Sequence, residues 1–185
     1  MRICLYGGSF NPITIAHQSI CRALSSSHKY DKVWLMPKLT SSDKKLEHFD
    51  HRVKMCELAV NNIPNIHVSN YEKYHPALNT TYDILISIMK EWSNYKFTIV
   101  TGSDNIRYFD KWSNVDKIFE MADVVVVHRP GYEINTKYHV EVLDVTPCTI
   151  SSTQFRNGDS SVVTPDVLKY IHQNELYRCS SFVKQ

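Results

Sequence analysis

The sequence predicts an α/β fold with a single doubly wound, mostly parallel sheet and helices on both faces of that sheet. Short apolar runs alternate along the chain with segments whose apolar residues recur every three or four positions. Strands that alternate with helices in this way build parallel sheets. Ligands of such sheets bind at the carboxyl ends of the strands, near the point where the strand order reverses.

Six apolar runs are the expected strands, at residues 3–6, 33–36, 66–68, 97–100, 124–127 and 140–145. Helical spacing of apolar residues is expected to give helices over 16–24, 53–63, 82–92 and 165–171, and a further helix is expected to end over 118–122. Thr80 with Asp83 resembles a capping box, and Thr164 before Pro165 is typical of a helix start. The polar stretch 38–50 has no periodicity and is expected to be a loop.

Length and composition indicate a soluble globular protein with one domain over residues 1–185. The net charge of +2 argues against a dedicated surface for nucleic acid or membranes. No apolar run approaches transmembrane length, and the first residues lack a signal-peptide pattern. The five cysteines include no CxxC pair, which favours reduced thiols. We therefore expect a cytoplasmic protein.

The segment that follows the first strand is suited to binding phosphate. Residues 7–17 read GGSFNPITIAH, and glycine at a strand exit lets a ligand approach the backbone closely. The helix behind the glycines directs its N-terminal N–H groups at the same place, which favours an anion. His17 in the first turn of that helix can stabilise charge on a phosphoryl oxygen in a transition state. The alternative is a polar residue satisfied under a loop.

A second segment of this kind lies near the other end of the chain. Residues 150–156 read ISSTQFR, which places Ser151, Ser152 and Thr153 at a helix start and Arg156 one turn further on. Hydroxyl and N–H groups there either cap the helix or hold an anion. Two such segments in one small domain favour an enzyme that handles nucleotides.

Other charged residues have weaker signals. Lys44 and Lys45 belong to the polar loop, which can close over a polyphosphate if it moves. Arg52 is expected to begin a helix and to point into the cleft. Residues 48–51 read HFDH, and the spacing of His48 and His51 resembles that of metal ligands, but no third ligand is evident, so no protein-held metal is expected.

Together these segments resemble the nicotinate/nicotinamide mononucleotide adenylyltransferases, of the nucleotidyltransferase superfamily with H-x-G-H and I-S-S-T-x-x-R signatures. The resemblance spans nearly the whole chain and includes Met36-Pro37, His51-Arg52-Val53, Thr81-Tyr82-Asp83, Gly102-Ser103-Asp104, Lys111-Trp112 and Arg129-Pro130-Gly131. It implies a Rossmann-like nucleotidyltransferase fold. It also implies transfer of the AMP part of ATP to nicotinate mononucleotide, with nicotinamide mononucleotide as a second acceptor, in NAD biosynthesis.

The resemblance implies residue roles as well. His17, Thr14 and Arg156 would be catalytic. ATP would be bound by Gly8, Ser9, Phe10, His17, Lys44, Gly102, Asp104, Ser151, Ser152, Thr153 and Arg156. The pyridine mononucleotide would be bound by Thr81, Trp112, Arg129 and Arg52. Mg²⁺ would accompany the leaving pyrophosphate, and catalysis would rest on positioning and charge stabilisation without a covalent intermediate.

Three segments depart from the family pattern. Thr14 stands where the signature has its first histidine, and Ala16 replaces the glycine; 41–44 read SSDK for P-P-H-K, and 79–81 read NTT for S-Y-T. Two alternatives therefore stay open. One is a pantetheine-phosphate adenylyltransferase, and the other is a non-catalytic nucleotide-binding module that lost activity with Thr14. The sequence also leaves open whether the protein forms a homo-oligomer.

Overall fold

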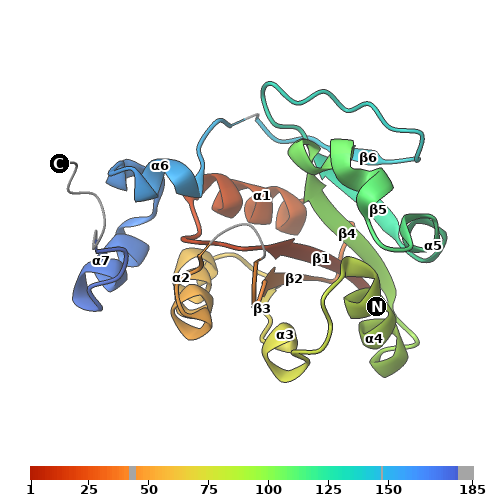
Figure 1. Ribbon diagram of the computed structural model, residues 1–185, viewed down its shortest axis with the longest axis horizontal. Coiled ribbons are helices and arrows are strands. Elements are labelled where there is room, and N and C mark those ends of the chain that lie inside the picture. Colours follow the sequence, from red (N-terminus) through yellow and green to blue (C-terminus); the bar gives the residue numbers. More distant parts are fainter. Residues whose placement is uncertain (42–44, 147, 179–185) are drawn as a thin grey trace.

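The computed structural model describes residues 1–41, 45–146 and 148–178, and a parallel sheet forms its centre (Figure 1). The strands are β1 (Arg2–Gly8), β2 (Lys32–Pro37), β3 (Ile66–Val68), β4 (Lys96–Gly102), β5 (Asp123–Val127) and β6 (Glu141–Leu143). They form one six-stranded sheet in the order β3-β2-β1-β4-β5-β6, with parallel pairing throughout. The predicted doubly wound parallel sheet is confirmed. Its strand order reverses between β1 and β4, which places the ligand-binding crevice at their carboxyl ends.

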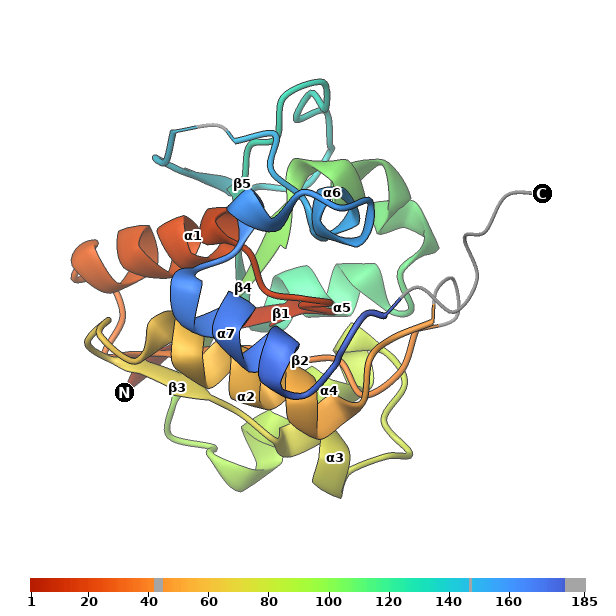
Figure 2. The same ribbon diagram turned by 90° about the vertical axis from the view of Figure 1, so that its left-hand side faces the viewer.

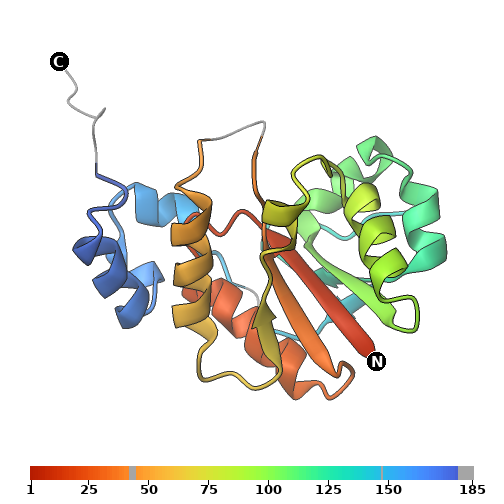
Figure 3. The same ribbon diagram turned by 90° about the horizontal axis from the view of Figure 1, so that it is seen from below.

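Helices cover both faces of the sheet (Figure 3). The α-helices are α1 (Ile15–Ser26), α2 (Phe49–Val60), α3 (Tyr71–Tyr74), α4 (Thr81–Glu91), α5 (Val115–Met121), α6 (Ser152–Arg156) and α7 (Pro165–Gln173). Two 3₁₀-helices are η1 (Ser103–Lys111) and η2 (Ser160–Val162). No helix in the described part of the chain has the length and apolar character needed to cross a membrane.

Side chains of β1 alternate between two hydrophobic clusters, as the period of a strand requires. Cys4 and Tyr6 are buried together with residues of α1, α2 and α7. Ile3 and Leu5 are buried on the opposite face with residues of α3, α4 and α5. The carboxyl end of β1 therefore separates two sides of the same crevice.

The chain after β6 returns to the start of α1. Figures 1 and 2 show α6 beside the N-terminal end of α1 and α7 beside α2. Val167 and Ile171 of α7 are buried in the same cluster as the α2 residues Met55 and Cys56. This return brings the second phosphate-type segment, 150–156, to the first, 7–17.

The expected elements are present, and their boundaries differ in places. The second helix begins at Phe49 rather than at 52–53, within the stretch expected to be a loop, and the helix that was expected to end over 118–122 spans Val115–Met121. The irregular stretch is accordingly shorter than expected. Helices α3 and η1 were not predicted, because α3 has four residues and η1 follows the three-residue repeat of a 3₁₀-helix, with Ile106 and Phe109 buried.

Candidate active site

Direct hydrogen bonds join the two phosphate-type segments. Arg156 Nη1 donates to the carbonyl oxygen of Asn11 at 2.6 Å, and Ser152 Oγ donates to the carbonyl oxygen of Pro12 at 2.8 Å. The starts of α1 and α6 therefore lie together at the carboxyl edge of the sheet. The N-cap side chain of each helix accepts from one first-turn N–H group, and the other first-turn N–H groups have no partner within their own helix, so both helix starts present donors at this edge.

The hydroxyl groups of the second segment act within the protein. Ser151 is the N-cap of α6, and its N–H donates to Gln154 Oε1 at 2.6 Å in a capping box. Thr153 Oγ1 accepts a hydrogen bond from Arg156 Nη2 at 3.0 Å. The capping role weighed from the sequence is therefore present. It orients the first turn of α6 and the guanidinium group of Arg156 together.

His17 lies in the first turn of α1, where Thr14 is the N-cap. Its Nδ1 atom accepts from the Thr14 N–H at 3.0 Å and lies 2.8 Å from Thr14 Oγ1. The ring packs edge-on against Phe10, with 5.2 Å between centroids and 85° between planes. Burial, together with a smaller effect of the nearby positive charge of Arg129, lowers the pKa of His17 to about 3. The imidazole is therefore neutral at physiological pH.

Glycine at position 8 is required by the ring of Phe10. A Cβ atom on Gly8 would lie 2.8 Å from the Phe10 ring, which is closer than real contacts allow. Phe10 itself has φ of 43°, in the left-handed region, and is 2% exposed. The backbone after β1 thus turns sharply around a buried aromatic ring, which fixes the path of residues 8–11 below the start of α1.

Arg52 has a different place from the one expected. It is fully buried, and its guanidinium group donates to the carbonyl oxygens of Glu47, Ser9 and Leu39 at 2.8, 2.9 and 3.3 Å. Burial lowers the pKa of this guanidinium. The side chain does not point into an open cleft. It ties the segment after β1 to both ends of the irregular stretch before α2.

Asn11 provides a second tie to the same stretch. Its Nδ2 donates to the carbonyl oxygen of Lys45 at 3.2 Å, and its Oδ1 accepts from the N–H of Glu47 at 3.0 Å. Tyr177, near the other end of the chain, also donates to Asn11 Oδ1 at 3.0 Å. Lys44 lies outside the described residues, so its expected contact with ATP is not placed.

Asp104 and Arg129 form an ion pair of 3.2 Å at the ends of β4 and β5. The Arg129 N–H also donates to Ser103 Oγ at 2.9 Å. A side chain on Gly102 would collide with the Asp104 carboxylate, so glycine is needed for this approach. Arg129 is close enough to His17 to affect its pKa. Arg129 therefore lies near His17 of α1, and its expected contact with the pyridine mononucleotide stays a prediction.

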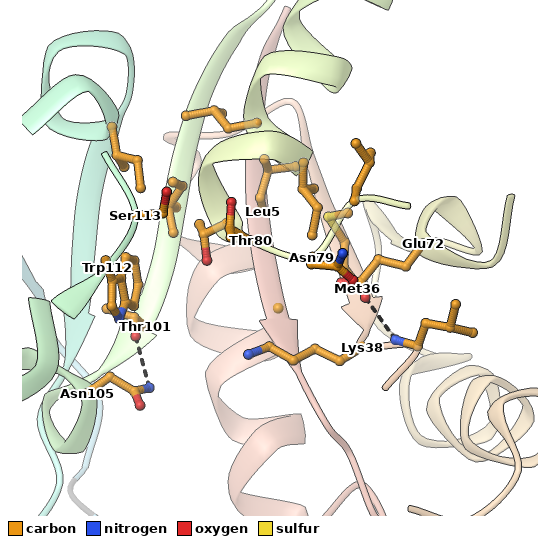
Figure 4. A pocket seen from close by; sticks show the side chains of 18 of the residues that line it. Leu5, Met36, Lys38, Glu72, Asn79, Thr80, Thr101, Asn105, Trp112 and Ser113 are labelled. Atoms are coloured by element: carbon orange, nitrogen blue, oxygen red, sulfur yellow. Dashed lines mark hydrogen bonds between the residues drawn. The ribbon is translucent and has the colours of Figure 1, made fainter. Parts of the chain in front are cut away.

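A cavity of about 680 Å³ opens on the α4 side of the crevice (Figure 4). Its wall is formed by the carboxyl ends of the central strands, through Gly7 of β1, Met36 of β2 and Thr101 of β4. Of the four residues expected to bind the pyridine mononucleotide, Thr81 and Trp112 line this cavity, whereas Arg129 and Arg52 are not among its lining residues. The volume is typical of a small-molecule site.

The sequence reading missed several polar residues of this cavity. They are Lys38, Glu72, Asn79, Thr101, Asn105, Lys111 and Ser113. Asn105 Nδ2 donates to Thr101 Oγ1 at 3.1 Å, and Glu72 Oε2 accepts from the N–H of Leu39 at 2.8 Å. Figure 4 shows the Lys38 side chain extending into the cavity from below Met36, toward the side formed by Trp112. The position of Lys38 directly after β2 could have predicted this placement, because the ends of the strands border the crevice.

The histidines at the start of α2 do not converge on one point. His51 Nδ1 lies 2.8 Å from the hydroxyl of Tyr170, and His48 Nδ1 lies 3.9 Å from Asp50 Oδ2. Among the residues placed by the structure, no group of three His, Cys, Asp or Glu side chains is arranged to hold a metal ion.

Comparison with known proteins identifies the family. Residues 5–158 match the family model described as cytidylyltransferase-like. The chain belongs to the cytidylyltransferase-like family. A probable nicotinate-nucleotide adenylyltransferase of Streptococcus mutans is 31% identical, over 96% of this chain and 89% of that protein. The nicotinate-nucleotide adenylyltransferase of Bacillus subtilis is 27% identical, over 95% of this chain and 98% of that protein.

The fold also matches a solved structure. Plasmodium falciparum nicotinic acid mononucleotide adenylyltransferase complexed with NaAD superimposes with a TM-score of 0.80. The match covers 95% of this chain and 97% of that chain, at 25% sequence identity. The Rossmann-like architecture expected from the resemblance is therefore confirmed.

Proposed function

We propose that this protein is a nucleotidyltransferase that moves the AMP part of ATP to nicotinate mononucleotide, in NAD biosynthesis. The observation that carries the proposal is the convergence of two helix starts, at α1 and α6, beside a cavity lined by Thr81 and Trp112. Relatives similar over almost the whole chain are nicotinate-nucleotide adenylyltransferases. A protein of the same fold is complexed with NaAD, the dinucleotide such a reaction forms.

The two sides of the crevice suit the two substrates. ATP would lie on the α1 side, with its triphosphate between the starts of α1 and α6 and its ribose near Gly102 and Asp104. The mononucleotide would lie in the cavity on the α4 side, with its ring between Thr81 and Trp112. Gly7 lines the cavity and adjoins Gly8, so the backbone at the end of β1 separates the two ligands by little more than its own thickness.

In this reaction a phosphate oxygen of the mononucleotide bonds to the α-phosphorus of ATP. The bond from that phosphorus to the bridging oxygen breaks, and the electron pair leaves with pyrophosphate. No protein nucleophile is required, so the chain contributes orientation and charge stabilisation. His17 donates a hydrogen bond as a neutral imidazole, and Arg156 supplies a permanent positive charge beside the first turn of α6.

We propose that Mg²⁺ arrives bound to ATP rather than to a protein cage. Mg²⁺ prefers phosphate oxygens and water with at most one or two carboxylates, and the carboxylate beside the crevice, Asp104, is paired with Arg129. The ion would neutralise charge on the departing pyrophosphate. The residues around the crevice fit a metal held mainly by its nucleotide.

The charges of the cavity support nicotinate over nicotinamide as the ring. Lys38 and Lys111 line the cavity, and Glu72 is the only acidic side chain among the described residues that line it. Burial raises the pKa of Glu72, which favours its uncharged form. A cavity with excess positive charge favours the substrate with the extra carboxylate.

We also propose a cytoplasmic location, in line with the state of the thiols. Cys4, Cys21 and Cys56 are free and fully buried. Burial raises the pKa of Cys21 to about 12 and raises that of the other two as well. Such thiols behave as small apolar core residues and need no disulfide to be stable.

A comparison of acceptors tests the substrate. We expect kcat/KM for nicotinate mononucleotide to exceed that for nicotinamide mononucleotide by at least about 10-fold, which corresponds to about 1.4 kcal/mol. Phosphopantetheine serves as the third acceptor. Turnover with phosphopantetheine and with neither pyridine mononucleotide would replace the proposed acceptor by pantetheine phosphate.

A further inference from the structure

Two groups of Thr14 contact the same nitrogen of His17. The main-chain N–H of Thr14 donates to Nδ1 at 3.0 Å, and the side-chain oxygen of Thr14 lies 2.8 Å from Nδ1. Thr14 is the N-cap of α1, with extended backbone angles of −119° and 169°, and His17 is the third residue of that helix. Both contacts therefore follow from the local geometry of one helix start.

This pattern assigns the proton of the ring. An amide N–H can only donate, so Nδ1 must present its lone pair and carries no hydrogen. Burial and the charge of Arg129 lower the pKa of His17 to about 3, so the doubly protonated ring is disfavoured. A neutral ring without hydrogen on Nδ1 has it on Nε2. The Thr14 hydroxyl is then the donor of its own contact with Nδ1.

The side chain of Thr14 is not available to a ligand. Thr14 is 1% exposed, and its hydroxyl hydrogen is directed to Nδ1. The resemblance implied a catalytic role for Thr14, and the geometry directs its hydroxyl to His17 rather than to a ligand. Nε2 lies on the other side of the ring, and no hydrogen bond joins it to any residue that the structure describes. The single N–H of the ring is thus free for a ligand.

The ring is also prevented from turning over. Phe10 packs edge-on against it at 5.2 Å, and Tyr6 lies 6.5 Å away by ring centroids. A flipped ring would put a carbon atom opposite both Thr14 donors and leave the buried hydroxyl without an acceptor. The two aromatic rings limit the plane of His17, and Thr14 selects which edge faces outward.

We propose that Thr14 is a positioning residue, whose hydroxyl and main-chain N–H hold His17 as the Nε2–H tautomer so that the ring donates to a phosphoryl oxygen of ATP. The inference rests on the proposed function and deepens it. It explains how a chain with threonine in place of the first signature histidine keeps an oriented donor. Of Thr14 and His17, only His17 would then contact ATP.

The test combines two variants with a spectroscopic readout on the ligand-free protein. Thr14→Val keeps the branched shape and removes the hydroxyl, whereas Thr14→Ser keeps the hydroxyl. Nitrogen-15 NMR of the imidazole distinguishes a protonated from an unprotonated ring nitrogen, and His17→Gln identifies the signal among the nine histidines. Thr164→Val is the matched control, since Thr164 is the N-cap of α7 and its buried hydroxyl has no partner.

We expect an unprotonated Nδ1 and a protonated Nε2 in the wild type and in Thr14→Ser. Thr14→Val is expected to show a mixed tautomer signal and about a 10-fold lower kcat, with KM for ATP changed less than about 3-fold. Thr14→Ser restores kcat to within about 3-fold of the wild type, and Thr164→Val leaves kcat unchanged.

Three results would overturn the inference. They are a protonated Nδ1 in the wild type, an unchanged tautomer and kcat in Thr14→Val, or equal losses of kcat in the serine and valine variants. If Thr14→Val does not fold, the spectrum of the wild type and the kcat of Thr14→Ser still test the inference. A wild type with the expected tautomer but no turnover with either pyridine mononucleotide would refute the proposed function and, with it, the catalytic role of the positioning.

Discussion

Arg156 and Asn11 are joined by a hydrogen bond of 2.6 Å although 145 residues separate them in the sequence. The guanidinium group donates to the Asn11 carbonyl through Nη1 and to Thr153 Oγ1 through Nη2. The side chain of Asn11 meanwhile holds Lys45 and Glu47. One arginine thus links the start of α6, the turn before α1 and, through Asn11, the stretch before α2. The shape of the side of the crevice proposed for ATP depends on this contact between distant segments.

Arg156→Ala removes both the tie and a positive charge. We expect kcat/KM for ATP to fall by about 100-fold, because charge-assisted contacts to phosphate are among the strongest that a side chain makes. KM for the mononucleotide is expected to change less than about 3-fold, since the cavity does not include Arg156. Arg178→Ala, an exposed position, is the control. A larger effect on the mononucleotide than on ATP would contradict the placement of ATP.

His17→Ala separates catalysis from binding. We expect kcat to fall by about 100- to 1,000-fold, as for the loss of one oriented donor to developing charge. The Kd of ATP should rise less than about 5-fold, because a neutral ring contributes little to ground-state binding of a polyanion. Calorimetric titration with ATP gives the Kd, and initial rates give kcat. Equal losses in both would mean that His17 only binds ATP.

The acid dependence of stability follows from the lowered pKa of His17. The folded protein has a pKa of about 3 at this residue, against an ordinary value of 6.5. Between these values the unfolded chain binds more protons, so the contribution of His17 is full above pH 6.5 and is lost as pH falls toward 3. The slope from this one group is at most about 1.4 kcal/mol per pH unit.

Urea unfolding of the wild type and of His17→Gln between pH 7 and pH 4 measures this contribution. We expect the wild type to lose stability more steeply than the variant over this range. An NMR titration of the His17 ring should show no midpoint between pH 5 and pH 8. A midpoint near 6.5, with parallel stability curves, would show that the imidazole is not held neutral.

Lys38→Gln tests the assignment of the cavity. We expect KM for nicotinate mononucleotide to rise by about 10-fold, because a hydrogen bond to a charged group is worth about 1.5 kcal/mol or more. KM for ATP should stay within about 2-fold of the wild type. Lys32→Gln is a matched control, since Lys32 begins the strand that Lys38 follows and lies at the opposite edge of the sheet. A rise in KM for ATP alone would place ATP in the cavity instead.

Arg52→Met distinguishes a structural from a substrate-binding arginine. Three carbonyl groups lose their donors, so we expect the free energy of unfolding to fall by about 3 kcal/mol. Arg22→Met, at an exposed position on α1, should change it by less than about 0.5 kcal/mol. Unchanged stability together with a higher KM for the mononucleotide would restore the role expected from the sequence.

Local patterns were sufficient to predict the sheet and most helices. The run Val124–Val127 is apolar on both faces, as a central parallel strand must be, and both of its sides are buried. Gly7 and Gly8 marked the end of β1, which is the strand beside the reversal of strand order. These features depend on neighbours in the sequence and can be recognised without the fold.

The roles of individual polar residues depend on distant partners and could not be predicted in the same way. Arg52 faces inward because carbonyl groups of Ser9, Leu39 and Glu47 surround it. Arg129 forms an ion pair with Asp104, which follows the neighbouring strand. It is not among the residues that line the cavity with Trp112. A charge beside a cleft looks the same in the sequence whether it meets a ligand or a carbonyl group.

The most direct test of the account is transfer of a label from the α-phosphorus of ATP. The wild-type protein is incubated with ATP labelled at that phosphorus, Mg²⁺ and nicotinate mononucleotide, and the products are separated. The account predicts label in the dinucleotide, with one pyrophosphate released for each dinucleotide formed. ATP that binds while its label stays in ATP, with no dinucleotide at any tested concentration of mononucleotide, would contradict it.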